Sequence, residues 1–373
     1  MDPLLSWAQS HQAEIIAEIR RFAECESPSG DDSALRRFAD LVASALSGVA
    51  KIRVKTHLTA EIDLPGRRKT GQKLALGHLD TVWPIGTLAQ MRVREKDGRL
   101  WGPGVLDMKS GIVFFLAATR ALRELDIPIP TRVLLQLNAD EEVGSRTSRE
   151  LTEKNAAKSD CVLVLEPGTG LEGKLKTARK GVGDYRLTVH GKAAHAGVDF
   201  AAGASAILEL SRQLQRIAGF TNLERGITVN PGVISGGSRS NVIAAEASAH
   251  IDVRIPRIRD AAPLDRKFRN LRPVDRRCRL ELSGGVNRPP MERTPGTVGL
   301  FRQAQKLARE MGIEIVESAT GGGSDGNFTS ALGIPTLDGL GGVGEGAHAP
   351  HESILTDRIA DRVALIAKLL QTA

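Results

Sequence analysis

Apolar and polar residues follow two different periods along the first half of the chain. Short apolar runs have the length and composition of buried strands: residues 73–77, 133–137 and 161–165. A longer apolar stretch, residues 109–125, has the length of a helix and is followed by Pro128 and Pro130. Strands that alternate with helices indicate an α/β sheet with helices on both faces. Because ligands gather at the carboxyl ends of such strands, polar residues after these runs are the first candidates for a site.

The N-terminal residues predict an amphipathic helix rather than a targeting segment. Apolar residues recur there near helical spacing: Leu4, Leu5, Ala8, Ile15, Ile16 and Ile19. An early acid, Asp2, stands where a secretory signal has its basic region. The most apolar run, residues 111–118, is too short to cross a bilayer and soon meets Arg120. We therefore expect a protein of the cytoplasm that does not enter the membrane.

Residues 180–288 carry a different pattern. Strand-like and helix-like segments follow one another in the order strand, helix, strand, strand, helix, strand: residues 184–189, 201–217, 227–234, 247–253, 259–271 and 279–282. This order predicts a small α+β unit with an antiparallel sheet. A helix at 298–311 and a strand at 314–317 then resume the first pattern. We expect an inserted domain at residues 180–288, inside a discontinuous catalytic domain formed by residues 1–179 and 289–373.

Composition and charge narrow the class of function. The 373 residues are 41% hydrophobic and 25% charged, as in ordinary globular proteins, and are numerous enough for two domains. The formal net charge is +7, and the densest basic run is residues 254–279. Aromatic residues make up only 3%, however, so stacking platforms for single-stranded nucleic acid are scarce. We expect no nucleic-acid partner, and interpret the basic surface as one that attracts small anionic substrates.

Five segments contain the residues that could carry chemistry. They are GHLDTV (His78, Asp80), GPGVLDMKSG (Asp107), ADEEVGS (Glu141, Glu142), VLEPGTG (Glu166) and GAHAPHE (His348, His351, Glu352). Each segment alone has an ordinary explanation, such as a histidine at a strand end, an acidic turn or a surface loop. Their joint occurrence is more informative, because histidines and carboxylates without a thiolate suit zinc or another divalent ion at a hydrolytic site.

The number of these side chains fits a site for two metals. Two ions need about three protein ligands each with one ligand shared, and one aspartate, two other carboxylates and two histidines meet that need. ADEEVGS then has one carboxylate to spare, which could take a proton from the attacking water and pass it to the leaving amine. Asp80, two residues beyond His78, could hydrogen-bond the imidazole and fix its tautomer.

The five segments, in this order, resemble the aminoacylase and carboxypeptidase family of peptidase clan MH. That family includes acetylornithine deacetylases, succinyl-diaminopimelate desuccinylases, dipeptidases and glutamate carboxypeptidases of the carboxypeptidase G type. The resemblance covers nearly the whole chain and is most specific in GHLDTV, GVLDMKSG and DEEVGS. It implies a mixed catalytic sheet flanked by helices, and an inserted α+β lid that also forms the contact of a homodimer.

The resemblance also implies roles for individual residues. One zinc ion would be held by His78, Asp107 and Glu166, and a second by Asp107, Glu142 and His348; cobalt or manganese could occupy similar ligands. Glu141 would be the general base and acid, Asp80 would support His78, and the peptide bond from Asp107 to Met108 would be cis. The family pattern places the last ligand four residues before a glutamate, which selects His348 rather than His351.

Further residues resemble the family's substrate contacts. HGKAAHAG places His195 where the family has a histidine that reaches across the dimer and polarises the scissile carbonyl. Asn241, Arg254 and Arg288 resemble lid residues that bind the substrate's carbonyl and carboxylate, for which arginine's planar fork is suited. Lys174 resembles a substrate-binding lysine, with Lys176 as its rival. GGGSDGN, residues 321–327, lacks the lysine of a phosphate-binding loop and resembles a loop that faces the substrate.

The expected function is hydrolysis of the amide bond of an N-acyl amino acid or a C-terminal amino acid with a free carboxylate, as in glutamate carboxypeptidases. The alternative within this class is a deacylase of the acetylornithine or succinyl-diaminopimelate type. A non-catalytic binding protein and a two-metal phosphoesterase are alternatives from other classes.

Overall fold

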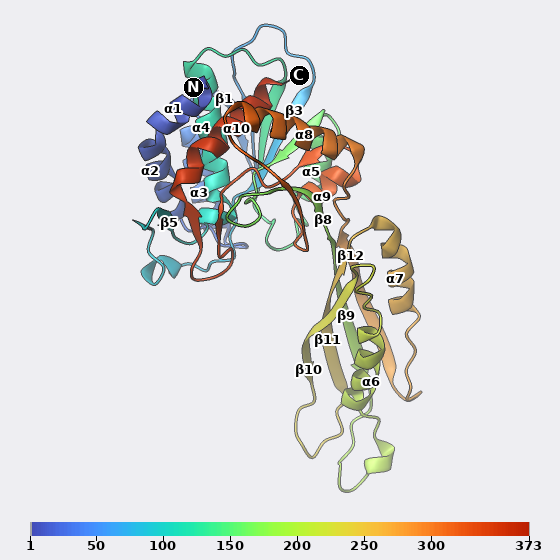
Figure 1. Ribbon diagram of the computed structural model, residues 1–373. Coiled ribbons are helices and arrows are strands. Elements are labelled where there is room, and N and C mark those ends of the chain that lie inside the picture. The colour runs from blue at the N-terminus through green and yellow to red at the C-terminus, as the bar shows by residue number, and fades with distance from the viewer. Residues whose placement is uncertain (1, 373) are drawn as a thin grey trace. The chain divides into compact units, whose positions relative to one another are not determined.

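A computed structural model describes residues 2–372 of the chain, which divide into two compact units (Figure 1). The first, here called the large unit, runs up to Ala178 and continues through Arg293–Thr320 and from Ser324 onward. The second, here called the inserted unit, is formed by Arg179–Glu292 with Gly321–Gly323. Among the residues described, no helix is both long and apolar enough to span a membrane.

A six-stranded mixed sheet is the centre of the large unit. Its strands lie in the order β1 (Ala50–Val54), β2 (Leu58–Ile62), β6 (Arg132–Asn138), β3 (Gln72–His78), β7 (Cys161–Val164) and β14 (Thr336–Leu337). β3 pairs in parallel with both β6 and β7, whereas β2 is antiparallel to β6. The three apolar runs of the sequence are therefore the three adjacent strands β6, β3 and β7, whose carboxyl ends point the same way.

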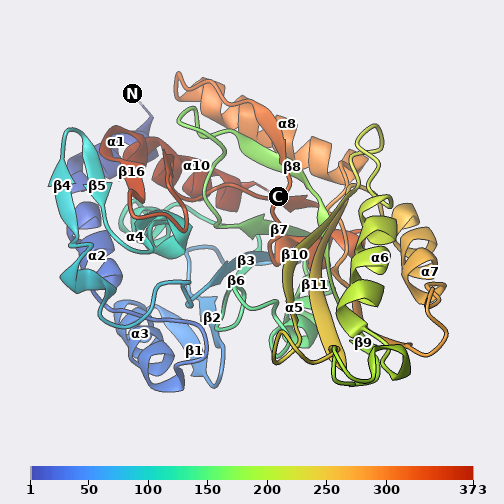
Figure 2. The same ribbon diagram turned by 90° about the horizontal axis from the view of Figure 1, so that it is seen from below.

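Helices cover both faces of this sheet, as the sequence predicted (Figure 2). They are α1 (Pro3–Ser10), α2 (Gln12–Ala23), α3 (Asp32–Ala45), α4 (Ser110–Glu124), α5 (Arg149–Ala156), α8 (Pro295–Glu310), α9 (Gly326–Ala331) and α10 (Ile359–Gln371). Alternate residues of β3 explain the two layers: Ala75 belongs to the main apolar cluster with α4 and α10, whereas Leu74 and Leu76 pack with Ala156 of α5 on the other face.

The N-terminal pattern forms two helices rather than one. α1 ends at Ser10, where the ring of His11 stacks on Trp7 with centroids 4.1 Å apart and its Nδ1 lies 2.8 Å from the carbonyl oxygen of Trp7. The remaining strands are short: β4 (Arg94–Lys96), β5 (Arg99–Trp101), β15 (Gly344–Glu345) and β16 (Ser353–Leu355) form one sheet, and β8 (Leu175–Arg179) pairs with β13 (Glu317–Thr320).

The inserted unit is an antiparallel sheet covered by two helices on one face. Its strands lie in the order β10 (Thr228–Gly236), β11 (Glu246–Ile255), β9 (Gly181–His190) and β12 (Arg279–Arg288), with α6 (Ala206–Ala218) and α7 (Ala261–Arg269). Alternate strand residues, such as Leu187 and Ile251, pack with both helices in one apolar cluster. The order of elements is the predicted one, and β10 is left as an edge strand.

Candidate metal centre

The candidate residues of the large unit follow the carboxyl ends of its parallel strands. His78 is the last residue of β3, and Glu166 comes two residues after β7 ends. Glu141 and Glu142 follow β6, which ends at Asn138. Three neighbouring strands thus deliver polar side chains to one edge of the sheet, as the sequence pattern predicted.

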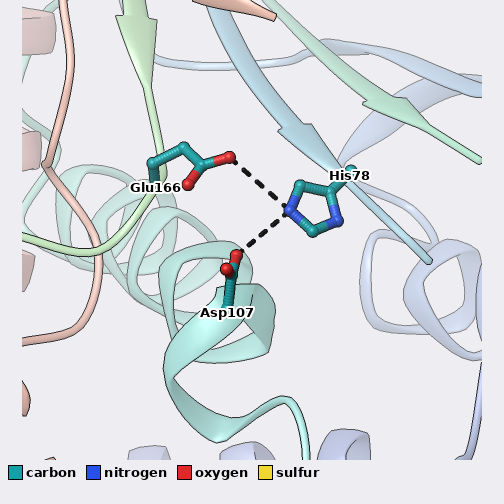
Figure 3. Close-up of side chains that lie close together, drawn as sticks. All are labelled: His78, Asp107 and Glu166. Atoms are coloured by element: carbon teal, nitrogen blue, oxygen red, sulfur yellow. Dashed lines mark hydrogen bonds and ion pairs between the residues drawn. The ribbon is translucent and has the colours of Figure 1, made fainter. Parts of the chain in front are cut away.

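His78, Asp107 and Glu166 form the first group (Figure 3). The Nε2 atom of His78 lies 3.3 Å from Oδ1 of Asp107 and 3.6 Å from Oε1 of Glu166. Its Nδ1 lies 2.8 Å from the main-chain oxygen of Asp80, an acceptor, so Nδ1 carries the proton of the neutral ring. The lone pair of Nε2 then faces two carboxylates inside the protein, an arrangement that calls for a cation or a second proton between them.

His348, Asp107 and Glu142 form the second group. Nε2 of His348 lies 3.3 Å from Oδ2 of Asp107 and 3.3 Å from Oε1 of Glu142. Asp107 therefore offers one oxygen to each group, which is the arrangement expected of a bridging ligand. The buried Oε1 of Glu142 accepts no hydrogen bond from any residue among 2–372.

These distances fit tetrahedral zinc. Ligand atoms about 2.0–2.2 Å from a tetrahedral ion lie about 3.4 Å from one another, close to the 3.3 Å and 3.6 Å found around His78. The donors are imidazole nitrogens and carboxylate oxygens, which suit zinc and, with less selectivity, cobalt or manganese. The residues therefore fit a pair of divalent ions that share Asp107.

The pKa values of the two histidines also indicate that both groups favour a cation. The carboxylates of Asp107 and Glu142, each 3.3 Å from Nε2 of His348, raise the pKa of this histidine to about 10. Burial alone would lower the pKa of His78, but its bonds to carboxylates, Asp107 foremost, outweigh burial and raise that pKa well above its ordinary value. In the metal-free protein, protons thus stand where cations would be held.

Asp80 contacts both His78 and the turn that carries Glu141 and Glu142. Its carboxylate lies 3.5 Å from Nδ1 of His78, whereas its main-chain oxygen is closer, at 2.8 Å. That carboxylate accepts the N–H groups of Glu141 and Glu142, each at 3.1 Å, and the hydroxyl of Ser29 at 2.7 Å. Asp80 therefore fixes the turn that carries the proposed base and one ligand.

His57 also holds this turn, a role that sequence reasoning missed. Its Nδ1 accepts the N–H of Ala139 at 3.2 Å, and its Nε2 lies 3.3 Å from the hydroxyl of Thr147. Thr147 in turn donates to Asp140 at 2.7 Å. His57 lies in the turn before β2, 82 residues from Ala139, and no motif surrounds it, so nothing in the sequence signals the contact.

The bridging aspartate lies in an irregular turn. Val105–Lys109 forms a π-helical turn in which Asp107 and Met108 have non-helical dihedral angles, and the peptide bond between them is cis, as the resemblance implied. His348 has a positive φ of 63° in the loop between β15 and β16. His351, its rival, is exposed and belongs to neither group.

The residues assigned to the lid lie in the inserted unit. His195 follows β9, and its neighbour Ala196 donates its N–H to the carbonyl of Asn241 at 3.0 Å, so these two candidates lie close together. Arg254 on β11 already has a carboxylate partner, Asp252, at 2.9 Å and 2.8 Å, which the sequence did not suggest. Arg288 is the last residue of β12 and is 8% exposed.

Lys174 and Lys176, both of the large unit, differ in their surroundings. Lys176 is 8% exposed, and its ammonium group donates to the carbonyl of Pro167 at 2.6 Å and lies 3.8 Å from Asp338. Lys174 is more exposed, with Glu172 at 3.8 Å. The exposed side chain is the better candidate for contact with a substrate, because Lys176 has a structural task.

We expect His348→Ala to lower zinc content more than His351→Ala does. Removal of His348 deletes one of three ligand atoms in the second group, whereas His351 contributes none. Metal per chain, measured by elemental analysis after dialysis against equal zinc, should fall toward one ion in His348→Ala and stay near two in His351→Ala. The reverse order would transfer the ligand role to His351.

Known proteins are similar to this chain over most of its length. Residues 74–372 match the profile of peptidase family M20/M25/M40. Carboxypeptidase G2 from Pseudomonas sp. (strain RS-16) is 27% identical over 98% of this chain and 91% of its own. Succinyl-diaminopimelate desuccinylase from Paracoccus denitrificans is 28% identical over 94% of this chain and 96% of its own.

Solved structures share the fold at lower identity. An M20 family metallo-carboxypeptidase from Sulfolobus solfataricus superposes with a TM-score of 0.75 at 18% identity, covering 96% of this chain and 98% of the other. Aminopeptidase PepT from Bacillus cereus gives a TM-score of 0.78 at 19% identity, with the same coverage. The profile match over most of the chain is the stronger finding, and it shows that this protein belongs to peptidase family M20/M25/M40, as a metallopeptidase or amidohydrolase of that family.

Proposed function

We propose that the protein is a two-zinc hydrolase that releases glutamate, or a similar amino acid with a free carboxylate, from an N-acyl or peptide conjugate. The observation that carries the proposal is the shared aspartate: Asp107 gives one carboxylate oxygen to each of two His–carboxylate groups. Bound there, two zinc ions supply Lewis-acid polarisation of the scissile carbonyl and a water of lowered pKa.

The protein residues then have separate tasks. His78 and Glu166 would hold one ion and Glu142 and His348 the other, and Asp107 would be a ligand of both. Glu141, next to a ligand and 6% exposed, takes the proton of the attacking water on its carboxylate and returns it to the leaving nitrogen. Its main-chain N–H donates a hydrogen bond to the carboxylate of Asp80, which limits the movement of the turn that carries this base.

Charge and sequence support a substrate with a free carboxylate. The inserted unit contains 19 Lys and Arg but 11 Asp and Glu between residues 179 and 292, so it carries all of the chain's net positive charge. We assign Arg254, Arg288 and Asn241 to the substrate's carboxylate and carbonyl, and Lys174 to its acyl side. Because Arg254 is paired with Asp252, it would bind a carboxylate by exchanging one anionic partner for another.

A homodimer through the inserted unit is part of the proposal. The edge strand β10 exposes Val233 and Ile234, at 60% and 65%, and α6 exposes Leu208 at 56%. An exposed edge strand with apolar side chains is suited to pair with the same strand of a second copy. The three cysteines, Cys25, Cys161 and Cys278, form no disulfide, which accords with the cytoplasm as the compartment.

The function is tested by amine release from zinc-loaded protein with two substrates side by side, an N-acyl-glutamate such as a folate analogue and N-acetylornithine. We expect a higher kcat/KM for the glutamate conjugate. Preference for acetylornithine would support the deacylase alternative, which the desuccinylase relative also favours. Release of phosphate from a phosphoester without amine release from either substrate would overturn the proposal.

We expect inactive His195→Ala and Glu141→Ala proteins to regain activity when mixed. If His195 acts in the site of the other subunit, a hybrid dimer contains one site with both residues intact. Random exchange at equal concentrations should restore about a quarter of the wild-type site concentration, because half of the dimers are hybrids with one intact site each. Exchange is followed separately by native mass spectrometry, and hybrids that form without activity would contradict action in trans.

A further inference from the structure

Glu352 is a buried carboxylate with an unusual set of donors. It is 0% exposed, and each of its two carboxylate oxygens accepts two hydrogen bonds from N–H groups. Oε1 accepts from the main-chain nitrogens of Leu106 and Asp107, at 2.9 Å and 3.0 Å. Oε2 accepts from the main chain of Gly104 at 2.9 Å and from the indole of Trp83 at 2.8 Å. The acceptor capacity of a carboxylate is about four bonds, so it is fully used.

These donors come from the segments that carry the candidate ligands. Leu106 and Asp107 belong to the turn of the bridging aspartate itself. Trp83 lies five residues after His78, and Glu352 lies four residues after His348. One carboxylate therefore connects the segments of His78, Asp107 and His348, which are distant in sequence.

The main chain around Glu352 is fixed as well. Its carbonyl accepts the N–H of Gly102 at 3.2 Å, and the adjacent Ser353 pairs with Trp101 in the β16–β5 ladder. Its own N–H donates to Ala349 at 2.9 Å, which closes the loop that contains His348. The carboxylate is thus carried by a main chain that is bonded to β5 and to the loop of His348.

We infer that Glu352 is a positioning residue for the metal pair: it fixes the turn of Asp107 relative to the loop of His348 so that both oxygens of Asp107 meet their ligand groups. This inference rests on the proposed zinc pair. Glu352 touches neither substrate nor metal in this role, and it acts through main-chain N–H groups. Loss of such support around metal ligands typically lowers metal affinity about 10–100-fold.

Glu352→Gln tests the inference with little change of shape. A glutamine amide has one acceptor oxygen, and its NH2 group must face either the N–H pair of Leu106 and Asp107 or the pair of Gly104 and Trp83. Because the NH2 group and the N–H groups that it faces are all donors, they repel one another, and we expect the turn of Asp107 to be displaced. We expect zinc affinity, measured by competition with a chelator, to fall about 10–100-fold.

Glu209→Gln is the matched control. Glu209 is also 0% exposed and accepts the main-chain N–H groups of Val274 and Asp275, each at 2.9 Å, but it lies in the inserted unit and outside both ligand groups. Glu209→Gln should lower the melting temperature of the metal-free protein without changing zinc affinity. A change of zinc affinity in Glu352→Gln no larger than in Glu209→Gln would show that Glu352 is structural only.

Trp83→Phe provides a second variant if Glu352→Gln does not fold. It removes one of the four donors and leaves the carboxylate, so it should weaken zinc binding less than Glu352→Gln and in the same direction. When Trp83→Phe is combined with Glu352→Gln, the glutamine amide faces one N–H group fewer, so part of the zinc affinity lost in Glu352→Gln should return. Unchanged zinc affinity in Trp83→Phe, with no recovery in the double variant, would overturn the inference. Wild-type protein that binds no zinc pair would instead contradict the proposed function.

Discussion

Glu141→Ala is expected to lower kcat about 10²–10⁴-fold while the protein keeps both zinc ions. Glu141 belongs to neither ligand group, so its removal deletes the proton carrier and leaves the metal ligands in place. Without it, water must lose its proton to solvent, and the leaving nitrogen must depart without a positioned acid. Turnover and zinc content are measured on the same preparation.

The adjacent carboxylate supplies the control. Glu142→Ala removes a ligand of the second group and should lower zinc content as well as turnover, although the two residues are neighbours in sequence and share Asp80 as a support. The pair therefore separates loss of a base from loss of a metal. A Glu141→Ala protein that turns over near the wild-type rate would contradict the assignment of the base, and one that loses zinc would make Glu141 a ligand.

The catalytic sheet could be predicted from the sequence because its strands are buried on both faces. β3, β6 and β7 appear as continuous apolar runs, and the long apolar stretch between β3 and β6 becomes α4, whose residues are buried on nearly every side. The edge strand β1 and its neighbour β2 were missed, because in both strands apolar residues alternate with polar ones and form no continuous apolar run. The predicted strand at 314–317 lies three residues later, at Glu317–Thr320.

The candidate ligands could be recognised in the sequence, whereas the residues that support them could not. His78 and Glu166 stand at the ends of recognisable strands, and His348 and Asp107 lie within specific motifs. His57 and Trp83 have neither signal, since each acts through contacts with segments far away in the chain. The sequence likewise could not show that the Asp80 carboxylate bonds the turn of Glu141, because that contact depends on how β3 and β6 lie side by side.

Removal of zinc is expected to destabilise the protein, and to do so more at high pH than at low pH. At free zinc about 1,000 times its Kd, binding to the folded state alone stabilises by about 4 kcal/mol. In the metal-free protein the raised pKa values of His348, about 10, and His78 mean that their protonated forms stabilise the fold below their ordinary pKa near 6.5. This contribution is lost as the pH rises from about 6.5 toward 10.

Zinc-loaded protein does not lose that contribution, because its imidazole ligands are neutral and carry no proton on the bound nitrogen. Protons also compete with zinc for the same nitrogens, so zinc affinity itself rises with pH. The difference between the melting temperatures of zinc-loaded and chelated protein should therefore widen from pH 6.5 to pH 9. Burial lowers the pKa of Lys109 to about 8, and this group titrates in the same range, so the difference rather than either temperature is the measurement.

His348→Ala is the control for this experiment. It lacks one titrating imidazole and one ligand, so its melting-temperature difference should be smaller than that of the wild type and should widen less with pH. A difference that stays constant from pH 6.5 to pH 9 would show that the histidines hold no extra protons in the metal-free state. If the chelated and zinc-loaded proteins melted together at every pH, the two groups around Asp107 would not bind metal, and the proposed mechanism would lose its basis.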